Sequence, residues 1–360
     1  MRAGKHSYFV KAEGEHFSHA LIAPYREEDI PIQVKTSKTK IVERKFKKEM
    51  SVFKDWREDS PYILQKSAEI DKREWKAPRF IKDPDEIEKC WDVIWKYFAR
   101  LKDIFITMAS RSNFPSVTIL DFTTFCDVCK IMDKNVNLST IDRLFIATNV
   151  EIIANDENPD KELCRFEFFE ILLRLGNVKY RETGISNSYH QALEKIIKEN
   201  VFANYKPYPW QEFRDRELWC VEVNDVFEAN IEGLKKLYAF FFDPRKKFMS
   251  MQDAIDMMIK LTPLLMTEKD AYFCYGMCKM TCVNEAEEST LRYKRMQFVE
   301  LFELIGRIAE VKFRGTEFET SMTLAQRIEF VLDDIFTLVD VRRRDVNIII
   351  DEQSESDDEY

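Results

Sequence analysis

Glycine is scarce in this chain, with eight glycines among 360 residues, about a third of average usage. No two of them have the spacing of GxGxxG or GxxxxGK, so no glycine-rich loop for a nucleotide phosphate is visible. Domains rich in strands also need glycine at their turns. The scarcity therefore predicts a mainly α-helical protein.

Composition places the chain among globular proteins, because 45% of its residues are hydrophobic and 33% are charged. Apolar runs such as residues 237–242 are far shorter than the roughly 18 residues of a membrane span. The first residues also lack the apolar centre of a signal peptide. We expect a cytoplasmic protein with no membrane contact and with eight reduced cysteines.

Charge is distributed unevenly along the chain. Residues 1–82 contain 19 Lys+Arg and 13 Asp+Glu, which leaves 36 and 51 for the remainder. Prolines interrupt this first stretch, and we predict an extended basic arm with few helices over residues 1–82. An acidic tail is expected at residues 344–360. No nucleic-acid-binding motif accompanies the arm.

The arm carries a cluster of basic residues that could contact an acidic partner, with a solvated charged stretch as the alternative. The cluster consists of Lys35, Lys38, Lys40, Arg44, Lys45, Lys47 and Lys48.

An internal repeat organises the rest of the chain. Residues 166–180 (FEFFEILLRLGNVKY) and 299–313 (VELFELIGRIAEVKF) share six of fifteen residues. Upstream helix starts keep nearly the same offset: a hydroxyl followed three residues later by an acid occurs at Thr118, Ser139, Ser250 and Thr267. We predict two lobes, residues 83–200 and 223–343, joined by a connector at residues 201–222.

Helix signals frame both lobes. Asp83, Pro84 and Glu86 form a helix start. The apolar residues that follow recur at steps of three and four, which predicts a long helix with one face in a core. A closing helix is predicted at residues 323–343 of the second lobe.

The helix–loop–helix units at residues 83–180 and 226–313 resemble EF-hands, and two pairs in tandem resemble the calmodulin superfamily. The repeated segment also resembles divergent EF-hand proteins of ciliate and flagellate axonemes. The resemblance implies calcium loops with oxygen ligands at positions 1, 3, 5, 7, 9 and 12 and glycine at position 6.

Three of the four loops lack these ligands. The first frame, residues 110–121, has a single carboxylate, Asp121, which is better explained as the capping partner of Thr118. The third, residues 243–253, places Arg245, Lys246 and Lys247 where ligands should converge, and positive charge there can repel or replace a metal ion. The fourth has Leu291, Tyr293 and Arg295 at positions 3, 5 and 7.

The second loop, residues 156–167, is the candidate calcium site. Its possible ligands are Asp156, Asn158, Asp160, Glu162 and Glu167. Lys161 stands at the glycine position, and the preceding helix favours a frame of residues 149–167, which is too long for one compact shell. No frame has glycine at position 6, so a scaffold without metal is the leading hypothesis. The alternative for the second loop is a solvated acidic loop.

Methionines and cysteines offer further candidates. Met257, Met258, Met277 and Met280 suit an open groove for a partner helix, with ordinary core packing as the alternative. The cysteines, including the CxxC at residues 126–129 and the series at 274, 278 and 282, are predicted to be core residues. No enzyme constellation is visible.

The sequence thus predicts a non-enzymatic structural or adaptor protein with no cofactor. By resemblance it belongs in a ciliary axoneme or another microtubule-associated assembly, with protein partners such as tubulin. A calcium sensor that uses the loop at 156–167, and a regulatory subunit of a phosphatase or kinase, are the alternatives.

Overall fold

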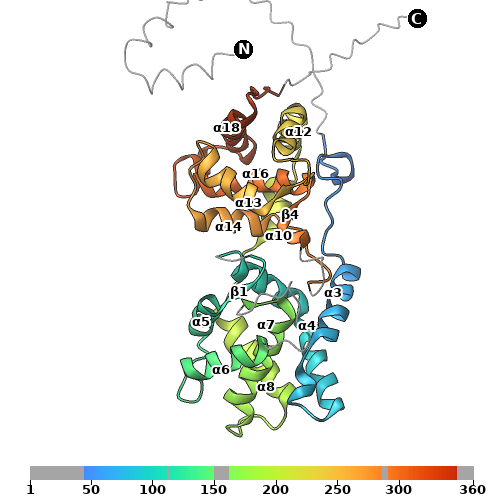
Figure 1. Ribbon diagram of the computed structural model, residues 1–360, viewed down its shortest axis with the longest axis vertical. Helices are drawn as coiled ribbons and strands as arrows, with labels where there is room; N and C mark the ends of the chain where they lie inside the picture. The colour runs from blue at the N-terminus through green and yellow to red at the C-terminus, as the bar shows by residue number, and fades with distance from the viewer. Residues whose placement is uncertain (1–43, 112–113, 150–161, 286–290, 347–360) are drawn as a thin grey trace, which may run out of the picture. The chain divides into compact units, whose positions relative to one another are not determined.

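The computed structural model describes residues 44–111, 114–149, 162–285 and 291–346. Within these ranges the chain is mainly helical, which confirms the prediction of a mainly α-helical protein (Figure 1). The only two sheets of the described residues are pairs of two-residue strands.

The first lobe consists of two helix–loop–helix units joined by a short antiparallel strand pair. Its elements are α4 (Pro84–Ala109), β1 (Val117–Thr118), α5 (Ile119–Val128), α6 (Leu138–Asn149), β2 (Glu162–Leu163) and α7 (Arg165–Gly176), which continues as the π-helix η4 (Asn177–Arg181). Val117 pairs with Leu163 across the two strands.

The second lobe follows a similar order, with two shorter helices in place of the long first helix and one additional short helix before its second strand. It contains α11 (Val221–Ala229), α12 (Ile231–Phe240), β3 (Met249–Ser250), α13 (Met251–Asp256), the π-helix η7 (Met257–Leu261), α14 (Glu268–Met277), α15 (Leu291–Lys294), β4 (Arg295–Met296) and α16 (Phe298–Phe313). Met249 pairs with Met296. In both lobes the strand pair therefore joins the two loops.

Local capping explains where most of these helices begin. The side chains of Asp83, Thr118, Ser250 and Thr267 each accept a hydrogen bond from the first turn of the helix that follows, as predicted. The expected start at Ser139 is wrong. Helix α6 begins at Leu138, and the Asn137 side chain accepts from the backbone N–H of Thr140.

Each lobe is followed by a helix that packs against its first and last helices. In the first lobe this is α8 (Tyr189–Lys195) with its π-helical continuation η5 (Ile196–Val201), which contacts α4 and α7. In the second lobe this helix is α18 (Leu324–Phe336), which follows the short α17 (Phe318–Ser321). Helix α18 contacts α11 and α16. The predicted closing helix ends earlier than residue 343, and a 3₁₀ turn, η9 (Thr337–Val339), follows it.

The connector is packed rather than loose. It forms α9 (Phe202–Asn204), α10 (Trp210–Phe213) and the π-helix η6 (Arg214–Leu218), and Phe213 and Leu218 are buried. A Cβ placed on Gly306 would lie 2.6 Å from Leu218 Cδ1, so glycine in α16 permits this close approach.

The described part of the arm also belongs to the packed body, because residues Arg44–Ile348 form one compact unit. This part contains η2 (Lys48–Met50), α3 (Pro61–Glu74) and η3 (Ala77–Arg79). Phe53 is fully buried, with its ring centroid 6.0 Å from those of Phe227 and Phe302. The prediction of an extended arm is therefore wrong for residues 44–82. Residues 1–43 and 347–360 lie outside the described residues.

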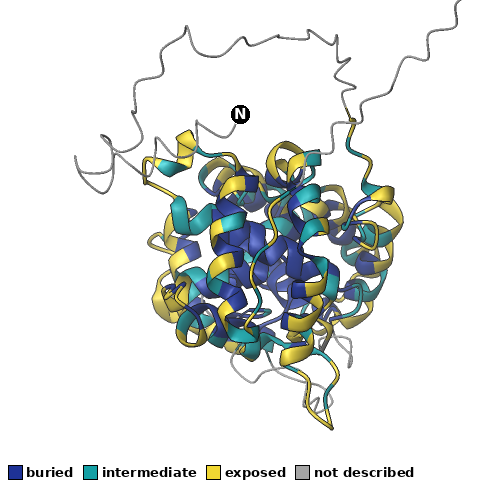
Figure 2. Ribbon diagram, turned by 90° about the horizontal axis from the view of Figure 1, so that it is seen from above, coloured by how far each residue is buried: buried dark blue, intermediate teal, exposed yellow. Residues whose placement is uncertain are grey.

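Buried residues run through the interior of this unit (Figure 2). None of the described helices combines the length and apolar composition that crossing a bilayer requires.

Candidate functional site

Four acids occupy equivalent positions in the two lobes: Asp121, Glu167, Asp253 and Glu300. Each lies in the first turn of the helix that follows a strand, where an EF-hand would place its bidentate calcium ligand. Asp121 accepts a hydrogen bond from Thr118 Oγ1 at 2.6 Å, as the sequence predicted.

The other three acids each accept from the backbone N–H at the helix cap. The distances are 3.1 Å for Glu167 and Cys164, 2.7 Å for Asp253 and Ser250, and 2.8 Å for Glu300 and Gln297. These contacts close capping boxes.

In the second loop, the Lys76 ammonium lies against Glu167. Lys76 Nζ is 2.9 Å from Glu167 Oε1 and donates to the Thr148 carbonyl at 3.1 Å. The Lys76 and Glu167 side chains are 7% and 0% exposed, so both charges are removed from water. Since a buried carboxylate is costly without a partner, this lysine stabilises the lobe.

In the fourth loop, Lys279 lies in the equivalent place. Its ammonium forms an ion pair with Glu300 and donates to the Arg295 carbonyl at 2.7 Å. In the EF-hand frame, Arg295 is position 7, which supplies a backbone carbonyl to calcium, and Glu300 is position 12. The ammonium of Lys279 thus contacts two of the groups that would otherwise bind the metal.

The third loop uses a lysine of its own. Lys246 Nζ lies 2.5 Å from Asp253 Oδ2. Partial burial alone would raise the pKa of Asp253, but hydrogen bonds from Lys246 and Ser250 outweigh it and lower that pKa. The sequence prediction that positive charge can replace the metal ion here agrees with this contact.

The described donors of these three loops do not fit calcium. The described parts of the second, third and fourth loops each have an ammonium group on the terminal carboxylate, and a divalent cation would have to displace it against charge repulsion. The described residues also contain no group of three or more His, Cys, Asp or Glu suited to a metal ion.

The predicted calcium ligands are only partly described. Asp156, Asn158 and Asp160 lie outside the described residues. Glu162 lies in β2, where its carboxylate accepts a hydrogen bond from Ser116 and its backbone carbonyl accepts from Asn149 Nδ2 at 2.7 Å.

The predicted partner-binding residues fall into separate groups. Lys35, Lys38 and Lys40 lie outside the described residues. Lys45 and Lys47 are exposed, whereas Arg44 pairs with Asp225 at 2.5 Å and Lys48 pairs with Glu58. The four methionines expected to line an open groove, Met257, Met258, Met277 and Met280, are buried in the core, so in this structure they do not face a partner.

Seven of the eight cysteines are buried, and Cys220 is partly exposed. Cys126, Cys129, Cys274, Cys278 and Cys282 are free thiols and are buried, as predicted. Burial raises the pKa of Cys129 to about 12, which keeps its thiol protonated and unreactive.

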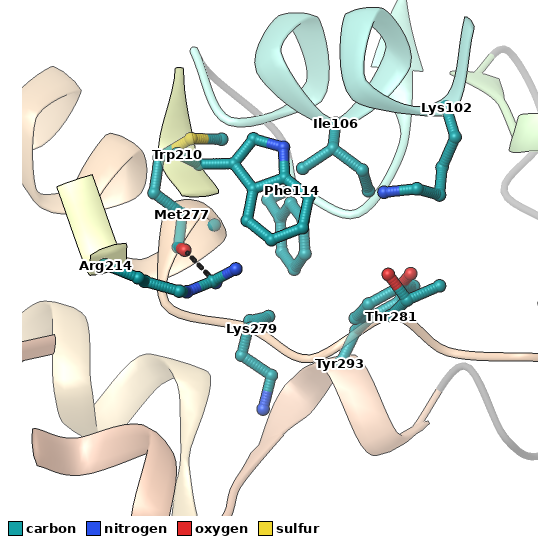
Figure 3. A pocket seen from close by; sticks show the side chains of 10 residues that line it. Lys102, Ile106, Phe114, Trp210, Arg214, Met277, Lys279, Thr281 and Tyr293 are labelled. Atoms are coloured by element: carbon teal, nitrogen blue, oxygen red, sulfur yellow. Dashed lines mark hydrogen bonds between the residues drawn. The ribbon is translucent and has the colours of Figure 1, made fainter. Parts of the chain in front are cut away.

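A cavity of about 20 Å³, room for a single water molecule, lies where α4, α10 and α14 approach one another (Figure 3). Lys102 and Arg214 line it, and the Trp210 ring lies 4.8 Å and 4.1 Å from their charged groups. Lys102 pairs with Asp59 and Asp103, and Arg214 pairs with Glu303. Because these cations are already paired, the cavity is a packing feature rather than a reaction site.

Sequence reasoning missed Lys76 and Lys279 because they are not equivalent in the repeat. Lys76 precedes the first lobe and Lys279 follows α14, so they reach the same position from unrelated parts of the chain. The available signal was indirect: a loop without ligands that still ends in an acid needs a cation from elsewhere.

Comparisons with known proteins returned no match to a family model, a curated protein or a solved structure.

Proposed function

We propose that the chain is a non-enzymatic structural adaptor built on two EF-hand-like lobes that lysine side chains, rather than calcium, hold in shape. The observation that carries this proposal is the contact of Lys279 with both the Glu300 carboxylate and the Arg295 carbonyl. The strand pairs that join the loops within each lobe support the EF-hand-like description.

Helices α8 and α18 support a scaffold role rather than a sensor role. Each packs on the first and last helices of its lobe, where an EF-hand pair would receive a target helix. Ala192 and Leu193 of α8, and Ile328 and Val331 of α18, are fully buried. In each lobe, the face formed by the first and last helices is thus covered by a helix of the chain itself. Partners would therefore bind the outer surfaces and the arm.

For the partner we propose an acidic surface such as tubulin in a ciliary axoneme, contacted by the basic arm. The exposed Lys45 and Lys47 support this, and Lys35, Lys38 and Lys40 extend the same cluster toward the N-terminus. Attraction of this kind weakens with salt, because exposed charges are screened.

Calcium titration of the full chain by calorimetry tests the lobes. We expect no micromolar binding, because the ammonium groups already compensate the terminal carboxylates. Micromolar binding that Glu167→Gln abolishes and the exposed control Glu268→Gln retains would instead make the second loop a calcium sensor.

Microtubule co-sedimentation tests the partner. The full-length variant K35Q/K38Q/K40Q should bind several-fold more weakly than the wild type, since exposed charge pairs are individually weak but act together. The matched control K134Q/K236Q/K269Q removes three exposed lysines from the packed unit and should bind like the wild type. If the arm variant and the control variant bind microtubules equally well, the arm is not the contact with the partner.

A further inference from the structure

The loop end of the second lobe exposes a second group of bases, distinct from the arm. Five side chains, which we call the basic loop surface, are exposed: Arg245, Lys247, Arg292, Lys294 and Arg295. They come from the third and fourth loops, the segments in which a calcium-binding lobe would concentrate its acids.

The strand pair brings these bases to one place. Ser250 of β3 pairs with Arg295 of β4, so the segments that contain residues 245–247 and 292–295 lie side by side. The Arg295 guanidinium lies 4.7 Å from the Phe248 ring centroid, which couples the two loops through a cation–π contact. An aromatic ring and its surrounding bases are thereby held on a rigid element.

The charges of this surface are available to a ligand. Among the described residues, none of the five bases forms an ion pair, whereas Lys246 between them turns to Asp253. The one acid between residues 243 and 248, Asp243, accepts from the backbone N–H groups of Arg245 and Lys246 at 2.7 Å. Within the described ranges, the five exposed bases therefore have no carboxylate as an ion-pair partner.

We propose that the basic loop surface binds an acidic peptide segment, rich in Asp and Glu, of a partner protein. Arginine forks match carboxylates in a two-point contact, and Phe248 adds an apolar platform. A long polyanion such as a nucleic acid is disfavoured because the chain carries a net charge of −9 and the bases are confined to two short loops. Salt screens the attraction between exposed charges over about 8 Å at physiological ionic strength, so only a short acidic segment close to the surface is attracted.

Fluorescence anisotropy with the full chain tests this assignment. The probe is a labelled decapeptide with six glutamates, and its control is the same peptide with glutamine in their place. We expect the acidic probe alone to bind, and K247Q/R292Q/K294Q to weaken it about tenfold. These residues are exposed, so the variant should fold, and Glu287 and Glu288 in the adjoining undescribed segment are retained throughout.

Two matched variants distinguish binding at the basic loop surface from an effect of the total charge and from binding at the arm. Both K134Q/K236Q/K269Q and K35Q/K38Q/K40Q should bind the probe within twofold of the wild type. Equal weakening by all three variants, loss through the arm variant alone, or tighter binding of an oligonucleotide or of phosphatidylserine vesicles would overturn the proposal. These variants leave the Lys76–Glu167 and Lys279–Glu300 pairs unchanged, so the calcium titration tests the scaffold proposal separately.

Discussion

A carboxylate that is removed from water requires a close positive or hydrogen-bonding partner, and the chain supplies one for Glu300 in Lys279. Because the ammonium is covalently attached, its presence does not depend on the concentration of a free ion. The conformation of a calcium loop changes when calcium binds or leaves, whereas this ion pair is present whenever the protein is folded. A covalently attached ion-pair partner therefore favours a static lobe.

Removing Lys279 tests the energetic role of this pair. Lys279→Met should lower the free energy of unfolding by about 3–5 kcal/mol, the usual effect of leaving a buried charge without its partner. The measurement is urea denaturation at pH 7, with the exposed Lys236→Met as a control that should change stability by less than about 0.5 kcal/mol.

The double variant K279M/E300Q distinguishes the charge pair from simple packing. It removes both charges, so we expect it to recover a substantial part of the stability lost in Lys279→Met. Glu300→Gln alone is measured as well. If the loss of stability in the double variant equals the sum of the losses in the two single variants, the two side chains act independently and the proposed compensation does not exist.

At the scale of elements, the helices whose starts depend on neighbouring residues were predictable from sequence. Thr118, Ser250 and Thr267 cap their own helices, and a cap involves only residues two or three positions away. The repeat likewise indicated two lobes with one order of helices. The start of α6 was misjudged because Asn137 and Ser139 are both good caps two residues apart.

The packing of the arm and the connector could not be predicted in the same way. Phe53 lies in a segment without helical periodicity, and its aromatic neighbours Phe227 and Phe302 are distant in sequence. Lys76 likewise meets Glu167 only after the chain folds back on itself. A single sequence contains local signals but not these long-range pairings. Three of the four loops were therefore predicted to lack calcium ligands, and Lys246 was predicted as a replacing cation. Lys76 and Lys279 were found only in the structure.

Phe53 provides a test of whether the described arm belongs to the core. Phe53→Ala should lower the free energy of unfolding by about 3–5 kcal/mol, because it empties a fully buried aromatic site between α11 and α16. The control Met50→Ala lies three residues away and is 77% exposed, so it should be nearly neutral. Similar small effects from both, measured by chemical denaturation, would show that the arm does not contribute to the core.

At the scale of the whole molecule, a buried charge cluster ties the arm and both lobes together. Arg165, at the start of α7, forms a two-point contact with Asp71 of α3 at 2.7 and 2.9 Å. The same guanidinium lies 2.8 Å from Glu285, which also accepts from Tyr293 OH at 2.9 Å. Three segments distant in sequence therefore depend on one arginine, which explains why residues Arg44–Ile348 form one unit.

This cluster predicts a specific dependence of stability on pH. Burial, opposed by the charge of Arg165 and assisted by Glu285 and Glu74, raises the pKa of Asp71 from 3.8 to about 6. The folded state therefore binds a proton more tightly than the unfolded state, so the contribution of Asp71 to stability is greatest below pH 3.8 and falls as the pH rises through 6. Relative to Asp71→Asn, the wild type should lose about 2 kcal/mol of unfolding free energy between pH 4 and pH 7. Urea denaturation of both proteins across this range measures the difference, in which other titrating groups largely cancel. A difference that is constant with pH, or that grows toward pH 7, would show that Arg165 fully compensates the Asp71 carboxylate and that the junction between the lobes is insensitive to acid.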